Sequence, residues 1–268
     1  MSRLPITILV AIVAASAMAP AQMVRDTPAG IKDVGIDDRS GASLSLGVAF
    51  TDATGNLVEL SRFFDGERPV IVTFNYASCP LLCKLQLNGL VESLREIQWT
   101  VGKEFRVVSI SIDPLETIQQ AAISKQHHVR AYGHPDSADG WAFLTGAPKS
   151  IAAATDAAGF RYKFLPDQRE FSHTAVAIIC MPDGVISRYL YGVQFEPRTL
   201  RLSLADASAG KVGSPLDQLL LFCFRYDSAT GKYTPAAWNL MRLGAVATIV
   251  ILSAFIFHYR FSGGKQVA

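Results

Sequence analysis

Apolar runs and amphipathic stretches alternate through the middle of the chain. Residues 70–76 are β-branched and aromatic, which predicts a buried strand, and residues 82–97 carry aliphatic side chains at helical spacing. A second β-rich run covers residues 105–112, and helix-forming patterns return over residues 116–129 and 148–158. Strands that alternate with helices in this way predict an α/β fold.

Hairpin patterns lie on both sides of this alternating region. A Thr-Gly-Asn turn interrupts residues 48–60, which predicts an N-terminal hairpin. Later, the apolar runs 174–181 and 185–191 flank Pro-Asp-Gly, a strong hairpin turn, and residues 197–209 predict a closing helix. Together these elements predict a mixed sheet flanked by helices.

Both ends of the chain carry apolar stretches that predict targeting and membrane insertion. Residues 1–21 combine a basic start at Arg3 with a short apolar stretch, so we expect a signal peptide cleaved after Ala21. A retained N-terminal anchor is the alternative. Residues 243–259 lack a formal charge, which predicts a transmembrane helix over residues 237–259. A helix buried in a soluble core is the alternative there.

These boundaries leave a linker at residues 22–41, a folded domain at residues 42–210, a connector at residues 211–236 and a tail at residues 260–268. A cleaved signal followed by one span places the domain on the exported, periplasmic side of a bacterial inner membrane, with the tail in the cytoplasm. The net charge is +2, and no basic patch is interleaved with aromatic residues, so a nucleic-acid partner is not expected.

Cys79 and Cys83 lie at the junction between the first predicted strand and the helix that follows it. Unpaired backbone N–H groups and the helix dipole stabilise thiolates there, which makes the sulfurs better nucleophiles and better metal ligands. At positions i and i+4 the two side chains can also face one another. A structural disulfide is the alternative, although so short a loop restrains the unfolded chain little.

An isolated histidine, His173, opens the apolar run that begins the second hairpin. It is also compatible with a satisfied core or surface position. With the two thiolates, its imidazole would form a soft donor set suited to Cu(I), which can also hold Cu(II) when an oxygen or water is added. Zinc is the rival, but structural zinc normally takes four ligands.

The remaining cysteines and histidines decide whether a fourth ligand is available. Cys180 lies in an apolar run and is predicted to be a buried structural thiol, whereas the role of Cys223 stays open, including a disulfide with Cys180. The histidines outside the predicted site are expected to be solvated or to have no part in metal binding: His127, His128, His134 and His258.

Three motifs carry a resemblance to a known family. The sequence VTFNYASCPLLC at residues 72–83 is followed by VSISIDP at residues 108–114, and then by His173 before the Pro-Asp-Gly turn. In this order and spacing they resemble the Sco/SenC family over roughly residues 42–209. The resemblance implies a thioredoxin-like fold and a membrane-tethered copper chaperone that helps assemble the binuclear copper centre of cytochrome c oxidase.

The same resemblance implies copper ligands and partners. The ligands are Cys79, Cys83 and His173, and the expected partner is subunit II of cytochrome c oxidase. Another copper-carrying chaperone is a further candidate partner, and the C-terminal helix is expected to contact the membrane. These expectations favour a metallochaperone over an enzyme.

Two other functions stay open. A thiol-disulfide oxidoreductase that acts on oxidase subunit cysteines needs only the pair Cys79 and Cys83 and an accessible thiolate. Thioredoxin-type enzymes have two residues between their cysteines and an X-Pro peptide facing them, whereas this chain has three residues there and Thr174 after His173. The third function is a binding module whose cysteines form a stabilising disulfide.

Overall fold

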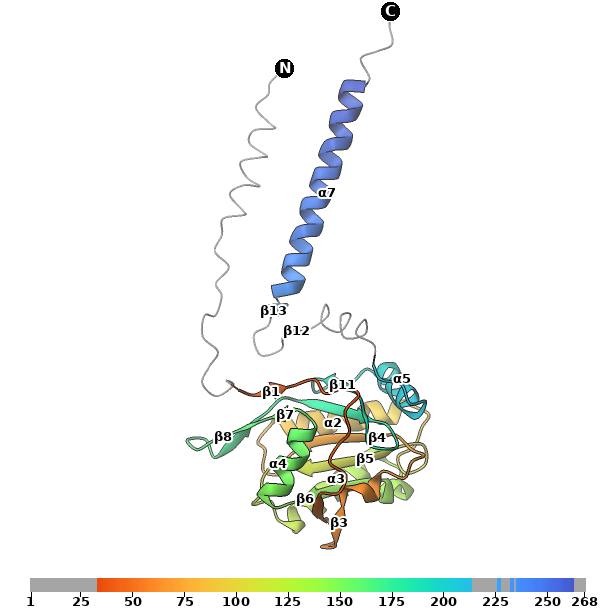
Figure 1. Ribbon diagram of the computed structural model, residues 1–268, viewed down its shortest axis with the longest axis vertical. Helices are drawn as coiled ribbons and strands as arrows, with labels where there is room; N and C mark the ends of the chain where they lie inside the picture. Colours follow the sequence, from red (N-terminus) through yellow and green to blue (C-terminus); the bar gives the residue numbers. More distant parts are fainter. Residues whose placement is uncertain (1–32, 214–225, 228–231, 234, 263–268) are drawn as a thin grey trace, which may run out of the picture.

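The centre of the protein is a seven-stranded mixed sheet. The computed structural model describes residues 33–213, 226–227, 232–233 and 235–262 (Figure 1). In spatial order the strands are β11 (Ile186–Tyr191), β10 (Val176–Cys180), β4 (Val70–Asn75), β5 (Arg106–Ser111), β6 (Trp141–Thr145), β2 (Ala49–Asp52) and β3 (Leu57–Glu59). Strands β4, β5 and β6 run parallel, and the outer strands are antiparallel to their neighbours. The predicted mixed sheet is therefore confirmed.

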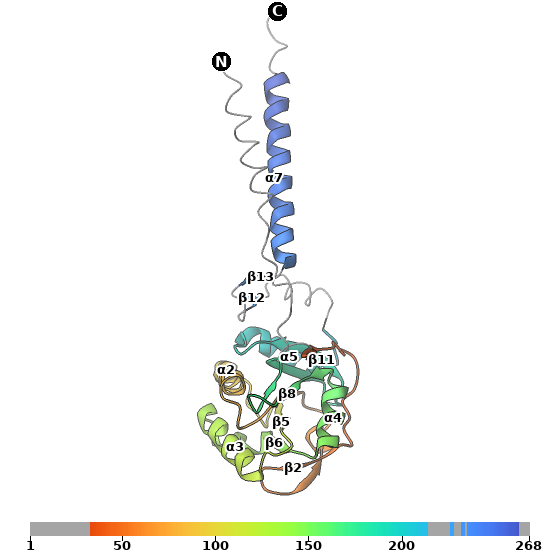
Figure 2. The same cartoon turned by 90° about the vertical axis from the view of Figure 1, so that its left-hand side faces the viewer.

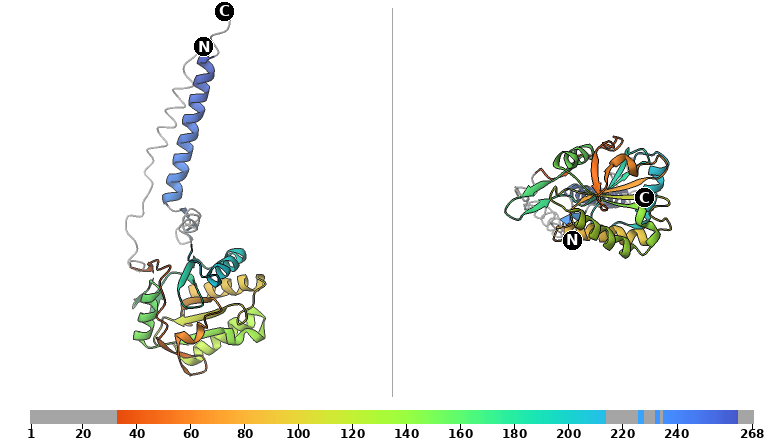
Figure 3. Two further views of the ribbon diagram at one scale, coloured as in Figure 1. Left: turned by 45° about the vertical axis from the view of Figure 1, so that its right-hand side comes forward. Right: turned by 90° about the horizontal axis from the view of Figure 1, so that it is seen from below.

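Helices cover both faces of this sheet, as Figures 2 and 3 show. The helices are α2 (Leu82–Glu96), α3 (Ile118–Tyr132) and α5 (Pro197–Ser208) on one face and α4 (Pro148–Ala157) on the other. Two short 3₁₀ helices, η1 (Leu60–Phe63) and η2 (Pro135–Gly140), lie in the connections. Each of the four predicted helices forms, with ends close to the predicted ones.

The side chains of β4 point alternately into two hydrophobic clusters, one on each face of the sheet. Val70, Val72 and Phe74 point into the cluster that contains α4, whereas Ile71 points into the cluster that contains α2 and α5. Successive side chains of a strand point to opposite faces, and both faces of this strand are covered. A continuous apolar run is the pattern that such a doubly buried parallel strand requires.

Local signals set the ends of α3, which packs beside α2 and β6. The Thr117 hydroxyl accepts the N–H of Gln120 at 3.2 Å, while the Gln120 side chain accepts the N–H of Thr117 at 2.8 Å. This reciprocal capping satisfies two backbone donors that the first turn leaves unpaired. At the other end Gly133 adopts a left-handed conformation with φ 82°, which stops the helix.

Short strands form three further pairs outside the main sheet. They are β1 (Gly35–Ile36) with β7 (Phe160–Arg161), β8 (Lys163–Leu165) with β9 (Glu170–Ser172), and β12 (Tyr226–Asp227) with β13 (Lys232–Tyr233). The first pair differs from the predicted linker at residues 22–41, because β1 already pairs with the domain at residues 35–36. The folded part thus begins before residue 42.

Sequence patterns identified most of the main sheet but not all of it. The hairpin predicted over residues 48–60 is confirmed as β2 and β3, and the second hairpin as β10 and β11. Strand β6 was not predicted, although all five of its residues are buried. A continuous apolar run this short has no period that separates a strand from a helix.

A long helix, α7 (Pro235–Ser262), covers the segment for which a transmembrane helix was predicted. Across the residues that the structure describes, no helix combines the length and the apolar character that crossing a membrane requires. The predicted span is therefore not confirmed. The predicted signal peptide at residues 1–21, most of the connector and most of the tail lie outside the described residues.

Candidate metal centre

The two cysteines lie where β4 gives way to α2, as predicted. Strand β4 ends at Asn75, and the N–H of Cys79 donates to the carbonyl of Tyr76 at 3.2 Å, which closes the turn. Helix α2 begins at Leu82, so Cys83 is its second residue. The site thus lies at the carboxyl end of a parallel strand, where open α/β sheets commonly bind ligands.

The sulfur of Cys79 takes the place of a capping side chain at the start of α2. Leu81, the residue at the N-cap, has no side chain that can accept a hydrogen bond. The Cys79 sulfur accepts the N–H of Cys83 at 3.3 Å. Backbone donors at a helix start favour an anion, so this arrangement favours the thiolate form of Cys79.

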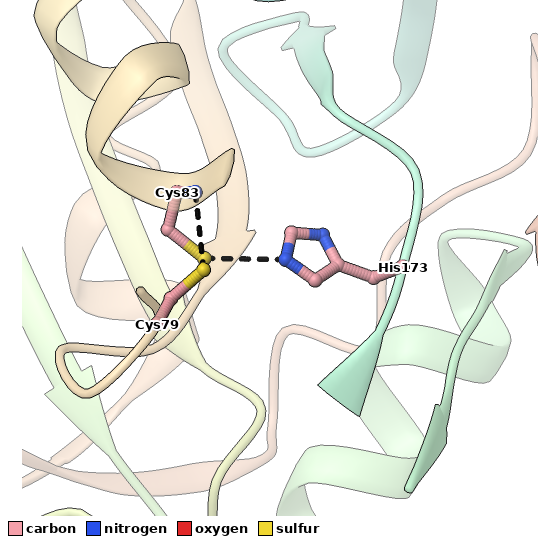
Figure 4. A group of neighbouring side chains, drawn as sticks. All are labelled: Cys79, Cys83 and His173. Atoms are coloured by element: carbon pink, nitrogen blue, oxygen red, sulfur yellow. Dashed lines mark hydrogen bonds between the residues drawn. The ribbon is translucent and has the colours of Figure 1, made fainter. Parts of the chain in front are cut away.

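His173 reaches the cysteines from the segment between β9 and β10. Its Nδ1 lies 3.2 Å from the carbonyl oxygen of Thr174, which can only accept, so Nδ1 carries the proton. Its Nε2 lies 3.2 Å from the Cys83 sulfur (Figure 4). In the neutral ring the lone pair of Nε2 is thus directed at the sulfurs, and the carbonyl fixes the ring orientation as an outer contact of a metal ligand does.

These contacts bring the three predicted residues into one group. The sulfurs of Cys79 and Cys83 and a ring nitrogen of His173 all lie within 4.8 Å of one another. The exposed fractions of the three residues are 4%, 3% and 7%. Both cysteines are free thiols. Among the described residues, no further His, Cys, Asp or Glu joins the group.

Hydrogen bonding between the sulfurs divides the negative charge unequally. The bond from the Cys83 thiol, with further bonds from backbone N–H groups, lowers the pKa of Cys79 to about 3 against the opposing effect of burial. The same bond between the sulfurs, together with burial, raises the pKa of Cys83. At neutral pH Cys79 is therefore a thiolate and Cys83 keeps its proton.

Such a group supports two kinds of chemistry. A thiolate, a thiol that can lose its proton and an imidazole nitrogen can bind a soft metal ion. A low-pKa thiolate beside a second thiol is also the arrangement that thiol–disulfide exchange uses. The geometry of His173 favours metal binding, because exchange between sulfurs needs no directed nitrogen.

Tyr76 and Glu116 contact the turn that carries the cysteines. Neither is predicted as a site residue from the sequence. The Tyr76 hydroxyl accepts the N–H of Phe171 at 3.2 Å. A Glu116 carboxylate oxygen accepts the N–H of Ala77 at 2.7 Å and the hydroxyl of Ser111 at 2.6 Å. Burial raises the pKa of Glu116, and these two hydrogen bonds oppose the rise. The contacts of Tyr76 with Phe171 and of Glu116 with Ala77 join residues 95 and 39 positions apart, so no local pattern reveals them.

The other cysteine and histidines whose side chains the structure describes do not belong to this group. Cys180 is fully buried in β10, as predicted, and burial raises the pKa of its thiol. Cys223 and the side chain of His258 lie outside the described residues. His127 and His134 are exposed.

The prediction that His128 is solvated was wrong. It is 5% exposed, stacks on Phe143 of β6 and contacts the carbonyl of Ser124 through Nδ1 at 2.7 Å. The expected solvation followed from the polar neighbours on α3, but His128 faces the sheet, as does Ala121. Burial lowers the pKa of its imidazole, which favours the neutral ring in this packing.

Comparison with solved structures found chains similar to this one, and the first of them agrees with the fold. A putative electron transfer protein from Aquifex aeolicus VF5 is 22% identical, with a TM-score of 0.56 over 64% of this chain and 95% of that chain. Arabidopsis thaliana ScoI with copper bound is 20% identical, with a TM-score of 0.47 over 60% of this chain and 99% of that chain. Bradyrhizobium japonicum ScoI with copper bound is 22% identical, with a TM-score of 0.45 over 63% and 98%.

Comparisons of the sequence identify the family. None of the curated proteins matches the chain. The model of the SCO1/SenC family matches residues 39–206, which include the whole main sheet and all three residues of the candidate metal centre. Because this match covers more than half of the chain, the protein belongs to the SCO1/SenC family.

Proposed function

We propose that the protein is a copper chaperone that binds copper through Cys79, Cys83 and His173 and helps assemble the copper centre of cytochrome c oxidase. The donor set carries the proposal, because two sulfurs and an imidazole nitrogen lie within 4.8 Å of one another in a buried site. Thiolate and imidazole ligands suit Cu(I). Membership of the SCO1/SenC family supports the same cargo.

Zinc fits this donor set less well. Structural zinc sites are almost always four-coordinate, and among the described residues the group offers three donors. Among the described residues, Cys180 is the cysteine that remains as a possible fourth ligand. It is fully buried in β10 and belongs to the apolar core instead. Three-coordinate Cu(I) needs no fourth ligand, and Cu(II) would add an oxygen or water.

The unequal protonation of the two sulfurs supports an order of binding. The Cys79 thiolate takes the incoming ion first, because its low pKa keeps it charged at neutral pH. Cys83 then loses its proton and adds the second sulfur, and Nε2 of His173 completes the shell. Transfer runs the other way, as thiolates of the acceptor displace these ligands one at a time.

The acceptor in this proposal is subunit II of cytochrome c oxidase, and another copper-carrying chaperone is a candidate donor. The domain would lie on the periplasmic side of the inner membrane, tethered through α7. Support for the tether comes from the uncharged sequence at residues 243–259 and from exposed apolar side chains on α7, including Leu243, Ile251 and Phe255. Protease added to intact spheroplasts should digest the domain, and full protection would contradict this topology.

A thiol-disulfide oxidoreductase is the second candidate, and the low pKa of Cys79 favours it. Beside Cys83, such a thiolate could attack a disulfide of an oxidase subunit. The product would be a disulfide between Cys79 and Cys83 and two reduced cysteines in the partner. This chemistry uses both sulfurs but leaves His173 without a direct part.

Replacing the histidine therefore separates the two functions. Oxidase activity is measured in membranes of cells grown at low copper that carry His173→Ala, Cys79→Ser or Cys83→Ser. The exposed His127, changed to alanine, is the matched control for loss of a histidine. If the protein delivers copper, all three site variants lose oxidase activity and the control keeps it. Near-normal activity in His173→Ala with loss in both cysteine variants would replace copper delivery by thiol chemistry.

A further inference from the structure

The histidine of the metal centre is carried by a hairpin that does not belong to the main sheet. Strands β8 and β9 pair with each other as a separate two-stranded sheet, and His173 follows β9 directly. Figure 1 shows this hairpin projecting from the side of the domain. A two-stranded hairpin alone is at best marginally stable in water. The position of His173 therefore depends on the contacts that hold the hairpin against the domain.

Tyr76 makes the polar contact between this hairpin and the cysteine turn. It follows β4, is 3% exposed, and its hydroxyl accepts the N–H of Phe171 in β9 at 3.2 Å. Its ring lies edge-on to that of Phe171, with centroids 5.4 Å apart, and edge-on to His173 at 6.1 Å. Burial raises the pKa of its phenol, and the charge of Cys79 adds to the rise.

The hydroxyl is therefore placed to link two sides of the metal centre. Phe171 pairs with Phe164 across the hairpin, yet its N–H is directed away from the hairpin toward Tyr76. Without this acceptor a partly buried N–H would have no partner, which is costly. The backbone carbonyl of Tyr76 accepts the N–H of Cys79 at 3.2 Å, so Tyr76 joins the hairpin to the cysteine turn.

We propose that Tyr76 is a positioning residue, whose hydroxyl latches the β8–β9 hairpin to the cysteine turn and so holds His173 within reach of the sulfurs. The consequence for copper rests on the proposed function, because only a bound metal makes His173 a ligand. With the latch released, both sulfurs stay in place on β4 and α2, while the nitrogen is presented less often. Copper would then be bound by the two sulfurs and less often by Nε2 of His173.

The chain offers a matched control in Tyr162. Its ring belongs to the same aromatic cluster, with centroids 5.8 Å from Phe171 and 6.2 Å from Phe160. Tyr76→Phe and Tyr162→Phe each remove one hydroxyl from this cluster and keep the ring. The control therefore reports what the loss of a phenol in this packing does by itself.

The first measurement needs no copper. Amide-resolved hydrogen exchange is recorded on the metal-free, full-length protein in detergent micelles. Tyr76→Phe should accelerate exchange at Phe171 about five-fold, because one hydrogen bond of ordinary strength is lost. Tyr162→Phe should leave exchange there unchanged. Equal exchange at Phe171 in wild type and Tyr76→Phe would overturn the latch, whether or not the protein binds copper.

The second measurement determines which atoms bind copper. Cu(I)-loaded protein is studied by X-ray absorption, and Tyr76→Phe should keep one copper and both sulfur ligands while its nitrogen contribution decreases. His173→Ala gives the reference spectrum without that nitrogen. An unchanged nitrogen contribution in Tyr76→Phe would overturn the role of the latch in positioning His173. If wild-type protein binds no copper, the proposed function fails, and the exchange measurement still decides the latch.

Discussion

Copper binding should release one proton from the two thiols near neutral pH. The experiment varies the pH, and the different pKa values of the two thiols determine the expected result. Because its pKa is lowered to about 3, Cys79 has already lost its proton throughout the neutral range. The pKa of Cys83 is raised, so this thiol still carries a proton that copper must displace.

The magnitude follows from linkage. Binding that releases one proton becomes tenfold tighter for each unit by which pH rises, or about 1.4 kcal/mol. Copper affinity should therefore increase with pH and fall as the solution becomes acidic. Cys79 adds nothing to this slope until the pH approaches its own low pKa, where a second proton begins to compete.

The assay is competition against a chromophoric Cu(I) chelator, under anaerobic conditions from about pH 6 to about pH 8.5. Proton release is measured independently by calorimetry in buffers of different ionisation enthalpy. His173→Ala is measured beside wild type, so that a proton carried by the imidazole is counted separately. In Cys79→Ser the hydrogen bond that raises the pKa of Cys83 is lost, so the slope should flatten toward higher pH.

Two results would contradict the unequal protonation of the two sulfurs. Release of two thiol protons in His173→Ala near pH 7 would mean that Cys79 is a neutral thiol, and that the helix start and the second sulfur do not stabilise its anion. Release of none would mean that Cys83 is also a thiolate and that the sulfurs share no proton.

Three further variants test two structural contacts and the assignment of the copper ligands. Gly89→Ala should destabilise the protein by about 1–3 kcal/mol in chemical denaturation, because its Cβ would overlap the carbonyl oxygen of Val193. Gly47→Ala, where nothing lies within 4 Å, is the control, and equal effects would contradict this contact. Glu116→Ala should cost about 1–3 kcal/mol by leaving the N–H of Ala77 without its acceptor, and unchanged stability would disprove it. Cys180→Ala should keep one bound copper per chain, and loss of that copper would make this buried thiol a ligand.

The cysteine half of the site could be predicted because it is local. A doubly buried strand followed by an amphipathic helix fixes where Cys79 and Cys83 lie, and the structure places them at that junction. His173 is ninety residues away from Cys83, and only the pairing of β10 with β4 brings its segment to the same edge. Its isolation at the start of an apolar run and the resemblance to a family made it a candidate, but no local pattern places it beside the cysteines.

What the sequence did not reveal depends on long-range packing. Strand β6 is too short for a period, and its parallel pairing with β5 decides that it is a strand. His128 appeared solvated because its neighbours along the chain are polar, but its contact is with Phe143 in that same strand. The role of Tyr76 rests on an amide 95 positions further along the chain, which no local pattern can indicate.

The most direct test of the central claim is an anaerobic Cu(I) titration of the reduced full-length protein, read by metal stoichiometry and X-ray absorption. We expect one copper per chain, bound by two sulfurs and one imidazole nitrogen, with the nitrogen absent in His173→Ala. Copper bound by sulfur alone in wild type, or no copper retained by the reduced protein, would contradict it.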